Sequence, residues 1–202
     1  DAERLATQFW PGPLTLVLAR AAQFPVSELA TAGLDSIAIR VPDHAVSHEI
    51  LRTFGGPVVA PSANLSGHVS PTSAQHVEVD LGGRIDLIVD GGPTPVGVES
   101  TIVACLGRPA LLRPGGLSRQ EIERAFGHPL SQPLEPADET PLAPGLLESH
   151  YAPRTKIRLN ATSVQPGELL LAFGPPLAGA AATLNLSEQG DVAEAAANLF
   201  GH

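Results

Sequence analysis

The sequence IAIRVPDHAVSHEILRTFGGPVVA, residues 37–60, passes from a strand-like run to a helix and back to a strand-like run. Residues 37–40 form the first run, and Asp43 is placed to cap a helix that ends at Gly55. Residues 58–60 form the second run. The helix would bury one apolar stripe, made of Val46, Ile50, Leu51 and Phe54. Such alternation predicts a mixed α/β fold.

The same alternation extends to both sides of this stretch. A helix is expected to open at Thr72 and to end at Gly82. Ser118 and Glu121 have the spacing of a capping box, in which each side chain accepts a hydrogen bond from a backbone N–H of the other residue. Further strands are predicted at residues 15–19, 87–89, 101–104 and 110–113. We therefore assign residues 1–128 to one α/β domain.

A proline-rich segment follows this domain. Residues 129–155 combine prolines and acidic residues without apolar periodicity, which predicts a linker. After it come predicted strands at residues 156–159, 168–173 and 183–186, and then a helix capped by Asp191. Residues 156–202 are thus expected to form the first part of a small second domain. Because the chain contains no Met and opens within a helix-like run, we expect it to be truncated at both ends.

Composition limits the classes of protein and partner. Hydrophobic residues make up 43% of the 202 residues, which excludes a disordered polar chain. No apolar run is long enough to span a membrane, so no membrane partner is expected. Twelve basic and 21 acidic residues give a net charge of -9, which disfavours stable binding to a nucleic acid. The lone Cys105 can form no internal disulfide, which favours the cytoplasm.

Polar side chains gather where predicted strands begin or end, and open α/β sheets bind ligands at such positions. Ser62 and Asn64 follow one predicted strand, and Ser100 precedes another. Arg113 ends a third strand, and Ser70 lies shortly before a helix. Each of these residues, taken singly, also fits a turn in which the side chain bonds its own backbone. Their pattern leaves both interpretations open.

Six motifs, taken together and in order, resemble those of a known family. They are FWPGPLT (9–15), IRVPDH (39–44), APSANLSG (60–67), ESTIV (99–103), LRPG (112–115) and HYAP (150–153). The chain resembles the YrdC/Sua5 family of L-threonylcarbamoyladenylate synthases, in its two-domain Sua5 form. This resemblance implies a twisted mixed sheet with flanking helices around a concave site, then the linker and part of a Rossmann-like C-terminal domain. The family's Lys-x-Arg and Pro-Thr-(Asp/Glu)-Thr-x-Tyr-Gly motifs are missing, and a protein lacking them is expected to have very weak activity or none.

The resemblance also implies a reaction. L-threonine, bicarbonate and ATP would give threonylcarbamoyl-AMP and pyrophosphate, the first step of N6-threonylcarbamoyladenosine formation in tRNA. No side chain would serve as nucleophile, because a carbamate oxygen attacks the α-phosphorus and the protein aligns the reactants. Mg²⁺ would neutralise the phosphates. A tRNA-modifying threonylcarbamoyl transferase complex is the expected recipient of the product.

Site residues follow from the resemblance by their positions in the motifs. The residues implied to bind threonine are Arg40, Ala60 and Ser100. Those implied to bind ATP are Ser36, Ser62, Asn64, Ser70, Thr101, Arg113 and Tyr151. His150 and Tyr151 are implied to form a lid that excludes water. Without the resemblance, Tyr151 is better explained by packing at the domain junction, and Ser36, Arg40 and Ser70 by surface, turn or capping roles. No protein ligand to a metal is implied.

Two other functions remain as alternatives. One is a non-catalytic RNA-binding module of the same fold, which the net charge disfavours. The other is a relative that transfers a carbamoyl group during metallocentre maturation, whose expected neighbouring domains are missing from this sequence.

His44 and His48 are four residues apart, a spacing that can hold zinc, but a solvated helix face explains them better. Cys105 is expected to be a small buried apolar residue.

Overall fold

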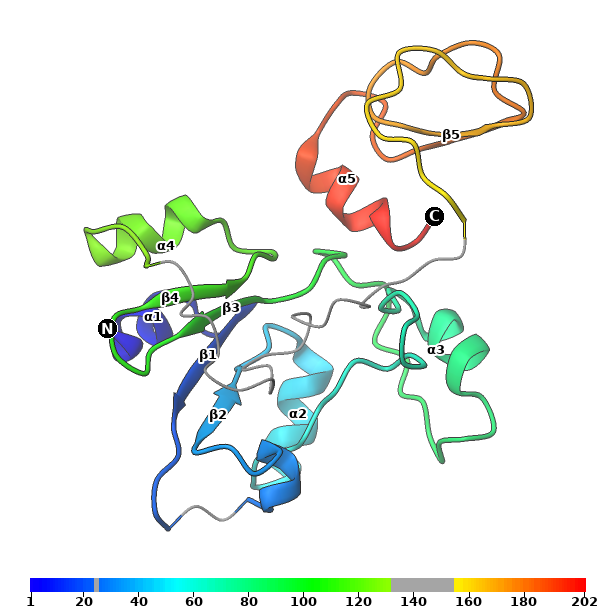
Figure 1. Cartoon of the computed structure of the whole chain (residues 1–202). Helices are drawn as coiled ribbons and strands as arrows, with labels where there is room; N and C mark the ends of the chain where they lie inside the picture. Colours follow the sequence, from blue (N-terminus) through cyan, green and yellow to red (C-terminus); the bar gives the residue numbers. More distant parts are fainter. Residues whose placement is uncertain (24–25, 132–154) are drawn as a thin grey trace. The chain divides into compact units, whose positions relative to one another are not determined.

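A computed structural model describes residues 1–23, 26–131 and 155–202 (Figure 1). Its elements, in chain order, are α1 (Ala2–Phe9), β1 (Leu14–Ala19), η1 (Glu28–Thr31), β2 (Ser36–Ile39), α2 (Ala45–Phe54), α3 (Ala74–Leu81), β3 (Thr101–Ala104), β4 (Ala110–Arg113), α4 (Arg119–Phe126), β5 (Leu169–Ala172), β6 (Ala182–Asn185) and α5 (Val192–Leu199). Two compact units form. The first joins the described residues of 1–61 and 99–148, and the second joins those of 62–98 and 149–202.

The first unit is built on a mixed sheet with the order β2-β1-β3-β4 (Figure 1). β1 runs antiparallel to β2 and parallel to β3, while β3 and β4 form an antiparallel pair. Parallel pairing aligns the starts of β1 and β3, because Leu14 lies opposite Thr101. The antiparallel register sets Ile102 opposite Arg113, so β4 ends where β3 begins. Three strand ends therefore meet at one end of the sheet.

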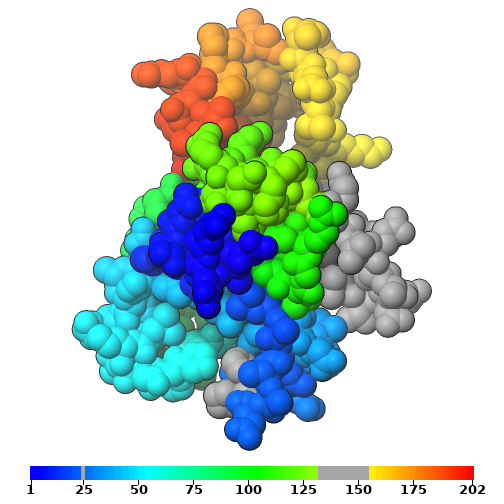
Figure 2. All heavy atoms as spheres, turned by 90° about the vertical axis from the view of Figure 1, so that its left-hand side faces the viewer, coloured from blue at the N-terminus to red at the C-terminus, as the bar shows by residue number. Residues whose placement is uncertain are grey.

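Helices α1 and α4 cover one face of this sheet. Leu14 and Leu16 of β1 are fully buried there, in a cluster that also takes in Leu5 of α1 and Ile122 and Phe126 of α4. In Figure 2 the dark-blue start of the chain lies directly beside the lime residues of α4. Alternation along the strands points Val17, Ile102, Ala104 and Leu112 to the opposite face, where they form a second buried cluster. The prediction of a mixed α/β fold is confirmed.

Local hydrogen bonds define the ends of α4 as the sequence predicted. The Ser118 side chain accepts from the Glu121 backbone N–H, and the Glu121 carboxylate accepts from the Ser118 N–H, which completes the capping box. Gly127 ends the helix with φ of 76°, a conformation that a residue without Cβ adopts readily.

Cys105 is half-buried and packs against the core cluster, and burial raises the pKa of its thiol.

Helix α2 corrects two expectations. Its N-cap is His44 rather than Asp43, because the His44 imidazole accepts the hydrogen bond from the Ser47 backbone N–H. The apolar stripe of α2 is not buried: Val46 is 37%, Ile50 46% and Phe54 67% exposed. The helix thus forms through its cap and its Gly55 C-terminus without a buried face.

Three predicted strands do not form, and one helix starts later than predicted. Residues 58–60, 87–89 and 156–159 pair with no strand among the described residues, and their large apolar side chains are exposed except that of Ile88, which is half-buried. A β-branched run becomes a strand only when a neighbour supplies ladder hydrogen bonds. Helix α3 is capped by Ser73, one residue after the predicted Thr72, because the Ser73 hydroxyl accepts from the His76 N–H.

In the second unit, β5 and β6 form a parallel pair, and Asp191 caps α5 by accepting from the Glu194 N–H at 2.8 Å. Gly97 lies against α5: a Cβ on it would be 2.3 Å from the Ala197 Cα. Residues 62–98 belong to the same compact unit as the C-terminal residues, so the compact units differ from the predicted division at residue 128, which stays a prediction. None of the helices in the described ranges has the length and apolarity needed to cross a bilayer.

Candidate functional site

Four polar side chains meet where β1 and β3 begin and β4 ends. We call Thr15, Glu99, Ser100 and Arg113 the strand-end cluster. The guanidinium of Arg113 donates from Nε to the Ser100 carbonyl at 3.1 Å and from Nη2 to the same oxygen at 2.9 Å. Nη2 also lies 3.2 Å from the Ser100 Oγ. Arg113 and Ser100 are thus fixed to each other although 13 residues separate them along the chain.

Glu99 forms an ion pair with the same nitrogen of the guanidinium. Its Oε2 lies 3.4 Å from Arg113 Nη2, and the two side chains are only 25% and 14% exposed. At that depth the ion pair restricts the guanidinium plane more than a solvated surface pair would. Within the described residues, no hydrogen bond uses Arg113 Nη1. The two N–H donors on Nη1 thus have no acceptor in the part of the chain that the structure describes.

The Thr15 hydroxyl completes the cluster. Its Oγ1 lies 2.8 Å from the Ser100 Oγ, across the parallel pair of β1 and β3. The Thr101 backbone N–H donates to the Pro13 carbonyl at 2.9 Å, which fixes the start of β3 against the start of β1. The resulting group of two hydroxyls, a guanidinium and a carboxylate is suited to hold carboxylate or phosphate oxygens.

The turn after β4 packs directly on the backbone of the cluster. The Gly116 N–H donates to the Glu99 carbonyl at 2.9 Å, and a Cβ on Gly115 would lie 2.3 Å from that same oxygen. Thr101 is fully buried, and its hydroxyl donates to the Leu117 carbonyl at 2.6 Å while accepting from the Leu117 N–H at 2.9 Å. The Thr101 hydroxyl therefore anchors this turn, and nucleotide contact by Thr101 stays a prediction.

Other predicted residues of the first unit lie at different distances from the cluster. Arg40 is exposed and follows Ile39, which pairs with Leu16, so it lies at the end of the sheet where Thr15 is found. Ser36 pairs with Ala19 at the opposite end of β2 and is buried. Four residues of extended chain separate Ser36 from Arg40, about 13 Å. Ala60 is exposed and belongs to no strand.

The loop containing Ser62 and Asn64 lies in the second unit. The Asn64 amide donates to the carbonyls of Leu65 at 2.9 Å and His68 at 3.1 Å. Its Oδ1 is buried and has no hydrogen-bond partner among the described residues. A buried acceptor without a donor costs free energy. The Asn64 amide oxygen is therefore a buried acceptor that no described donor satisfies. Ser62 itself is exposed.

Asp80 of α3 fixes this loop. Its carboxylate accepts from the Leu65 backbone N–H at 3.1 Å and from His68 Nδ1 at 3.1 Å. The hydrogen bond from His68, followed by that from the Leu65 backbone, holds the pKa of Asp80 below its ordinary value of 3.8. Nothing in the sequence pattern pointed to Asp80, because its role depends on the packing of α3 against a loop 15 residues away.

We expect Asp80 to make stability depend on pH at the acid end. Because its pKa is lower in the folded protein, its contribution is complete above the unfolded pKa, near 3.8, and is lost as the pH falls through the folded pKa. Asp80→Asn should therefore flatten the decline of unfolding free energy below about pH 4. Urea unfolding at several pH values measures this. Asp86→Asn, a change at an exposed aspartate of the same unit, should leave the wild-type decline in place.

The remaining predicted residues are not members of the strand-end cluster. Ser70 is half-buried shortly before α3, where the Thr72 backbone N–H donates to His76 Nδ1 at 3.3 Å. His150 and Tyr151 lie outside the described residues. His48 Nε2 contacts the Pro42 carbonyl. In the parts of the chain that are described, no three side chains of His, Cys, Asp or Glu come together to hold a metal.

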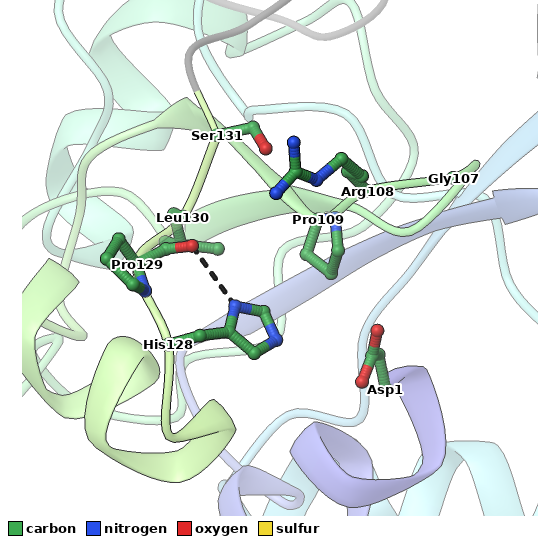
Figure 3. A pocket seen from close by; sticks show the side chains of 8 residues that line it. All are labelled: Asp1, Gly107, Arg108, Pro109, His128, Pro129, Leu130 and Ser131. Carbon is green, nitrogen blue, oxygen red and sulfur yellow. Dashed lines mark hydrogen bonds between the residues drawn. The ribbon is translucent and has the colours of Figure 1, made fainter.

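The first unit also has a cavity of about 580 Å³ away from these residues (Figure 3). It is lined by Asp1, Gly107, Arg108, Pro109, His128, Pro129, Leu130 and Ser131. The exposed Arg108 comes from the β3–β4 turn, and His128 stacks on Phe126 with ring centroids 5.2 Å apart. None of the predicted binding residues that lie within the described ranges lines it. We therefore locate the candidate site at the strand-end cluster, where polar groups converge, rather than at this cavity.

Family models and individual relatives indicate the same similarity to known proteins. The Sua5, YciO and YrdC family model, described as telomere recombination, matches residues 1–115, and the model of the threonylcarbamoyl-AMP synthase C-terminal domain matches residues 117–202. Threonylcarbamoyl-AMP synthase of Bacillus subtilis is 47% identical over 161 residues, covering 78% of this chain and 46% of the relative. The Pyrococcus abyssi enzyme of the same name is 45% identical over 160 residues, again covering 78% and 46%.

A solved structure gives a similar result. The crystal structure of P. abyssi Sua5 complexed with L-threonine superimposes with a TM-score of 0.79 at 36% identity, covering 99% of this chain and 63% of that one. The chain spans about half the length of the curated relatives it matches.

Proposed function

The chain belongs to the Sua5, YciO and YrdC family, and from this premise we propose that the protein makes threonylcarbamoyl-AMP from L-threonine, bicarbonate and ATP. The observation that carries the proposal is the strand-end cluster, in which Arg113 is fixed on Ser100 and no hydrogen bond within the described residues uses its Nη1. Relatives named threonylcarbamoyl-AMP synthase, at 45–47% identity, support the same activity.

The reaction needs alignment and charge stabilisation more than covalent catalysis. The threonine amine and bicarbonate form a carbamate with loss of water. A carbamate oxygen then bonds to the α-phosphorus of ATP while the bond to the bridging oxygen breaks and pyrophosphate leaves. Negative charge collects on phosphate oxygens in this step, and fixed guanidinium and hydroxyl donors stabilise it. The donors of the strand-end cluster are of this kind, and no side-chain nucleophile is required.

For threonine, we propose contacts with Ser100, Arg40 and the Ala60 backbone. Arg40 would pair with the substrate carboxylate, for which a guanidinium offers two parallel N–H donors. Its position supports this assignment, because Arg40 is exposed at the end of the sheet where Thr15 is found. The crystal structure of P. abyssi Sua5, which is complexed with L-threonine, supports threonine as the amino acid that this chain binds.

For ATP, two arrangements of donors and acceptors support the proposed contacts. In the first unit, Arg113 provides N–H donors for phosphate oxygens. In the second unit, Asn64 Oδ1 is a buried acceptor that a ligand N–H can satisfy. The other proposed nucleotide contacts are Ser36, Ser62, Ser70, Thr101 and Tyr151. We further propose that His150 and Tyr151 form a lid that protects the mixed anhydride from water.

Mg²⁺ is proposed to accompany ATP. The strand-end cluster holds hydroxyls, a guanidinium and one carboxylate, and that carboxylate, Glu99, is paired with Arg113. This donor set suits anions better than a bare cation, so the ion would be held by the phosphates, whose charge it neutralises.

The proposed recipient of the product is a tRNA-modifying threonylcarbamoyl transferase complex, with the reaction located in the cytoplasm. No observation favours the RNA-binding or carbamoyl-transfer alternatives.

Release of pyrophosphate from ATP tests this function. The full-length protein should release pyrophosphate only when both L-threonine and bicarbonate are present. Omission of either one should reduce the rate to the background without enzyme. Pyrophosphate release that does not depend on threonine would contradict the proposal and would point to a different acceptor of the adenylyl group.

A further inference from the structure

Thr15 lies in the strand-end cluster although no pattern in the sequence assigns it a role. Thr15 is half-buried, and Ser100 is the one hydrogen-bonding partner of its hydroxyl among the described residues. Its backbone is fixed by ladder pairing between β1 and β3. The contact joins residues 85 positions apart in the sequence. The arrangement raises the question of what this hydroxyl does to Ser100.

The donors and acceptors of the two hydroxyls, together with those of a bound ligand, set the direction of the hydrogen bond between Thr15 and Ser100. A serine hydroxyl has one hydrogen to donate and can accept two hydrogen bonds. Arg113 Nη2 has only hydrogens to give, so Ser100 Oγ accepts from it. Either direction leaves one of the two hydroxyl hydrogens without an acceptor among the described residues. A carboxylate placed against Ser100 can only accept, so it takes the Ser100 hydrogen, and the favoured arrangement with such a ligand has Thr15 donating to Ser100.

This direction decides what Ser100 offers to a ligand. Ser100 Oγ then accepts from both Thr15 and Arg113, and its own hydrogen has no acceptor within the described ranges. A hydroxyl that accepts two hydrogen bonds, one from a guanidinium, is polarised and becomes a stronger donor. The positive charge of Arg113 nearby favours an anionic acceptor over an ammonium group. Ser100 is thereby prepared to donate to a carboxylate oxygen.

We propose that Thr15 is a positioning residue that orients the Ser100 hydroxyl so that it donates to the carboxylate of the bound amino acid. This inference rests on the proposed function, because it takes L-threonine as the ligand of Ser100. Thr15 acts through Ser100 and does not itself touch the substrate. Its removal should therefore weaken amino-acid binding without weakening ATP binding.

Calorimetric titration of the full-length protein with L-threonine, and separately with ATP, tests the proposal. Thr15→Val keeps the shape of the side chain but removes the donor, and it should raise the Kd for L-threonine about tenfold while the Kd for ATP stays the same. Thr15→Ser keeps the hydroxyl and should restore the wild-type Kd. Thr183→Val, at an exposed position on β6, is the matched control and should change neither constant.

A double-mutant cycle separates positioning from a structural role. If Thr15 acts through Ser100, adding Thr15→Val to Ser100→Ala should cause no further loss of L-threonine affinity. L-2-aminobutyrate keeps the carboxylate and lacks the hydroxyl of threonine, so Thr15→Val should weaken its binding by the same factor. The cycle and the Thr15→Ser variant remain informative even if Thr15→Val lowers the melting temperature.

Several outcomes would overturn the proposal. They are an unchanged Kd for L-threonine in Thr15→Val, equal losses for L-threonine and ATP, failure of Thr15→Ser to restore binding, additive losses in the cycle, and unchanged binding of L-2-aminobutyrate. A wild-type protein that binds no L-threonine would instead contradict the proposed function, and with it the ligand assumed for Ser100. The wild-type titration therefore distinguishes the two failures.

Discussion

Replacing Arg113 with alanine is expected to lower kcat/KM for threonylcarbamoyl-AMP formation by about 100-fold or more. The change removes the N–H donors proposed for the phosphates. It also removes the two donors to the Ser100 carbonyl and leaves the Glu99 carboxylate without this partner. Pyrophosphate release at varied ATP and L-threonine concentrations measures the loss, and thermal unfolding shows whether the fold survives.

Two further arginine variants sharpen this prediction. Arg113→Lys keeps the charge but cannot reproduce the paired Nε and Nη2 contacts, so we expect about a tenfold loss. Arg108→Ala is the matched control, because Arg108 is an exposed arginine in the turn between β3 and β4 and should leave the activity unchanged. Activity of Arg113→Ala within about twofold of wild type would remove Arg113 from the proposed site.

Gly115→Ala is expected to destabilise the protein by about 3 kcal/mol. The added Cβ would lie 2.3 Å from the Glu99 carbonyl oxygen and 2.6 Å from both the Ser100 carbonyl carbon and the Thr101 nitrogen. All three are backbone atoms, so the clash cannot be relieved by turning a side chain. Relieving it requires a shift of the turn or of the backbone at Glu99, Ser100 and Thr101, where the strand-end cluster is held. Activity should therefore fall together with stability.

Gly107 gives the matched control for this substitution. It lies in the turn between β3 and β4, and a Cβ added there would meet nothing within 4 Å. Gly107→Ala should change the unfolding free energy by less than about 1 kcal/mol. Urea unfolding of both variants gives the comparison. Equal stability of the two variants would mean that the turn after β4 does not pack on Glu99 and Ser100 as described.

The parts of the fold that depend on local hydrogen bonds could be predicted from the sequence. The capping box at Ser118 and the strands at residues 101–104 and 110–113 form where the pattern indicated. In contrast, residues 58–60 and 87–89 have apolar β-branched composition but no strand partner among the described residues. Whether such a run joins a sheet depends on tertiary packing, which local sequence does not encode.

The residues of the candidate site likewise fall into those that the sequence could predict and those that depend on tertiary packing. Ser100 and Arg113 were predicted because they stand at strand ends in recognisable motifs. The role of Thr15 could not be predicted, since it follows from the parallel pairing of two strands that are far apart in sequence. The Asp80 contact with the loop after Ser62 likewise arises from packing alone. Sequence patterns thus identified the residues proposed to face a ligand better than those that hold them in place.

Mass spectrometry of the reaction products tests the central claim most directly. Full-length protein supplied with ATP, L-threonine and ¹³C-labelled bicarbonate should form an adenylate that contains one threonine and one ¹³C atom, and unlabelled bicarbonate should give the same product one mass unit lighter. Formation of an adenylate without threonine, or without carbon from bicarbonate, would contradict the account.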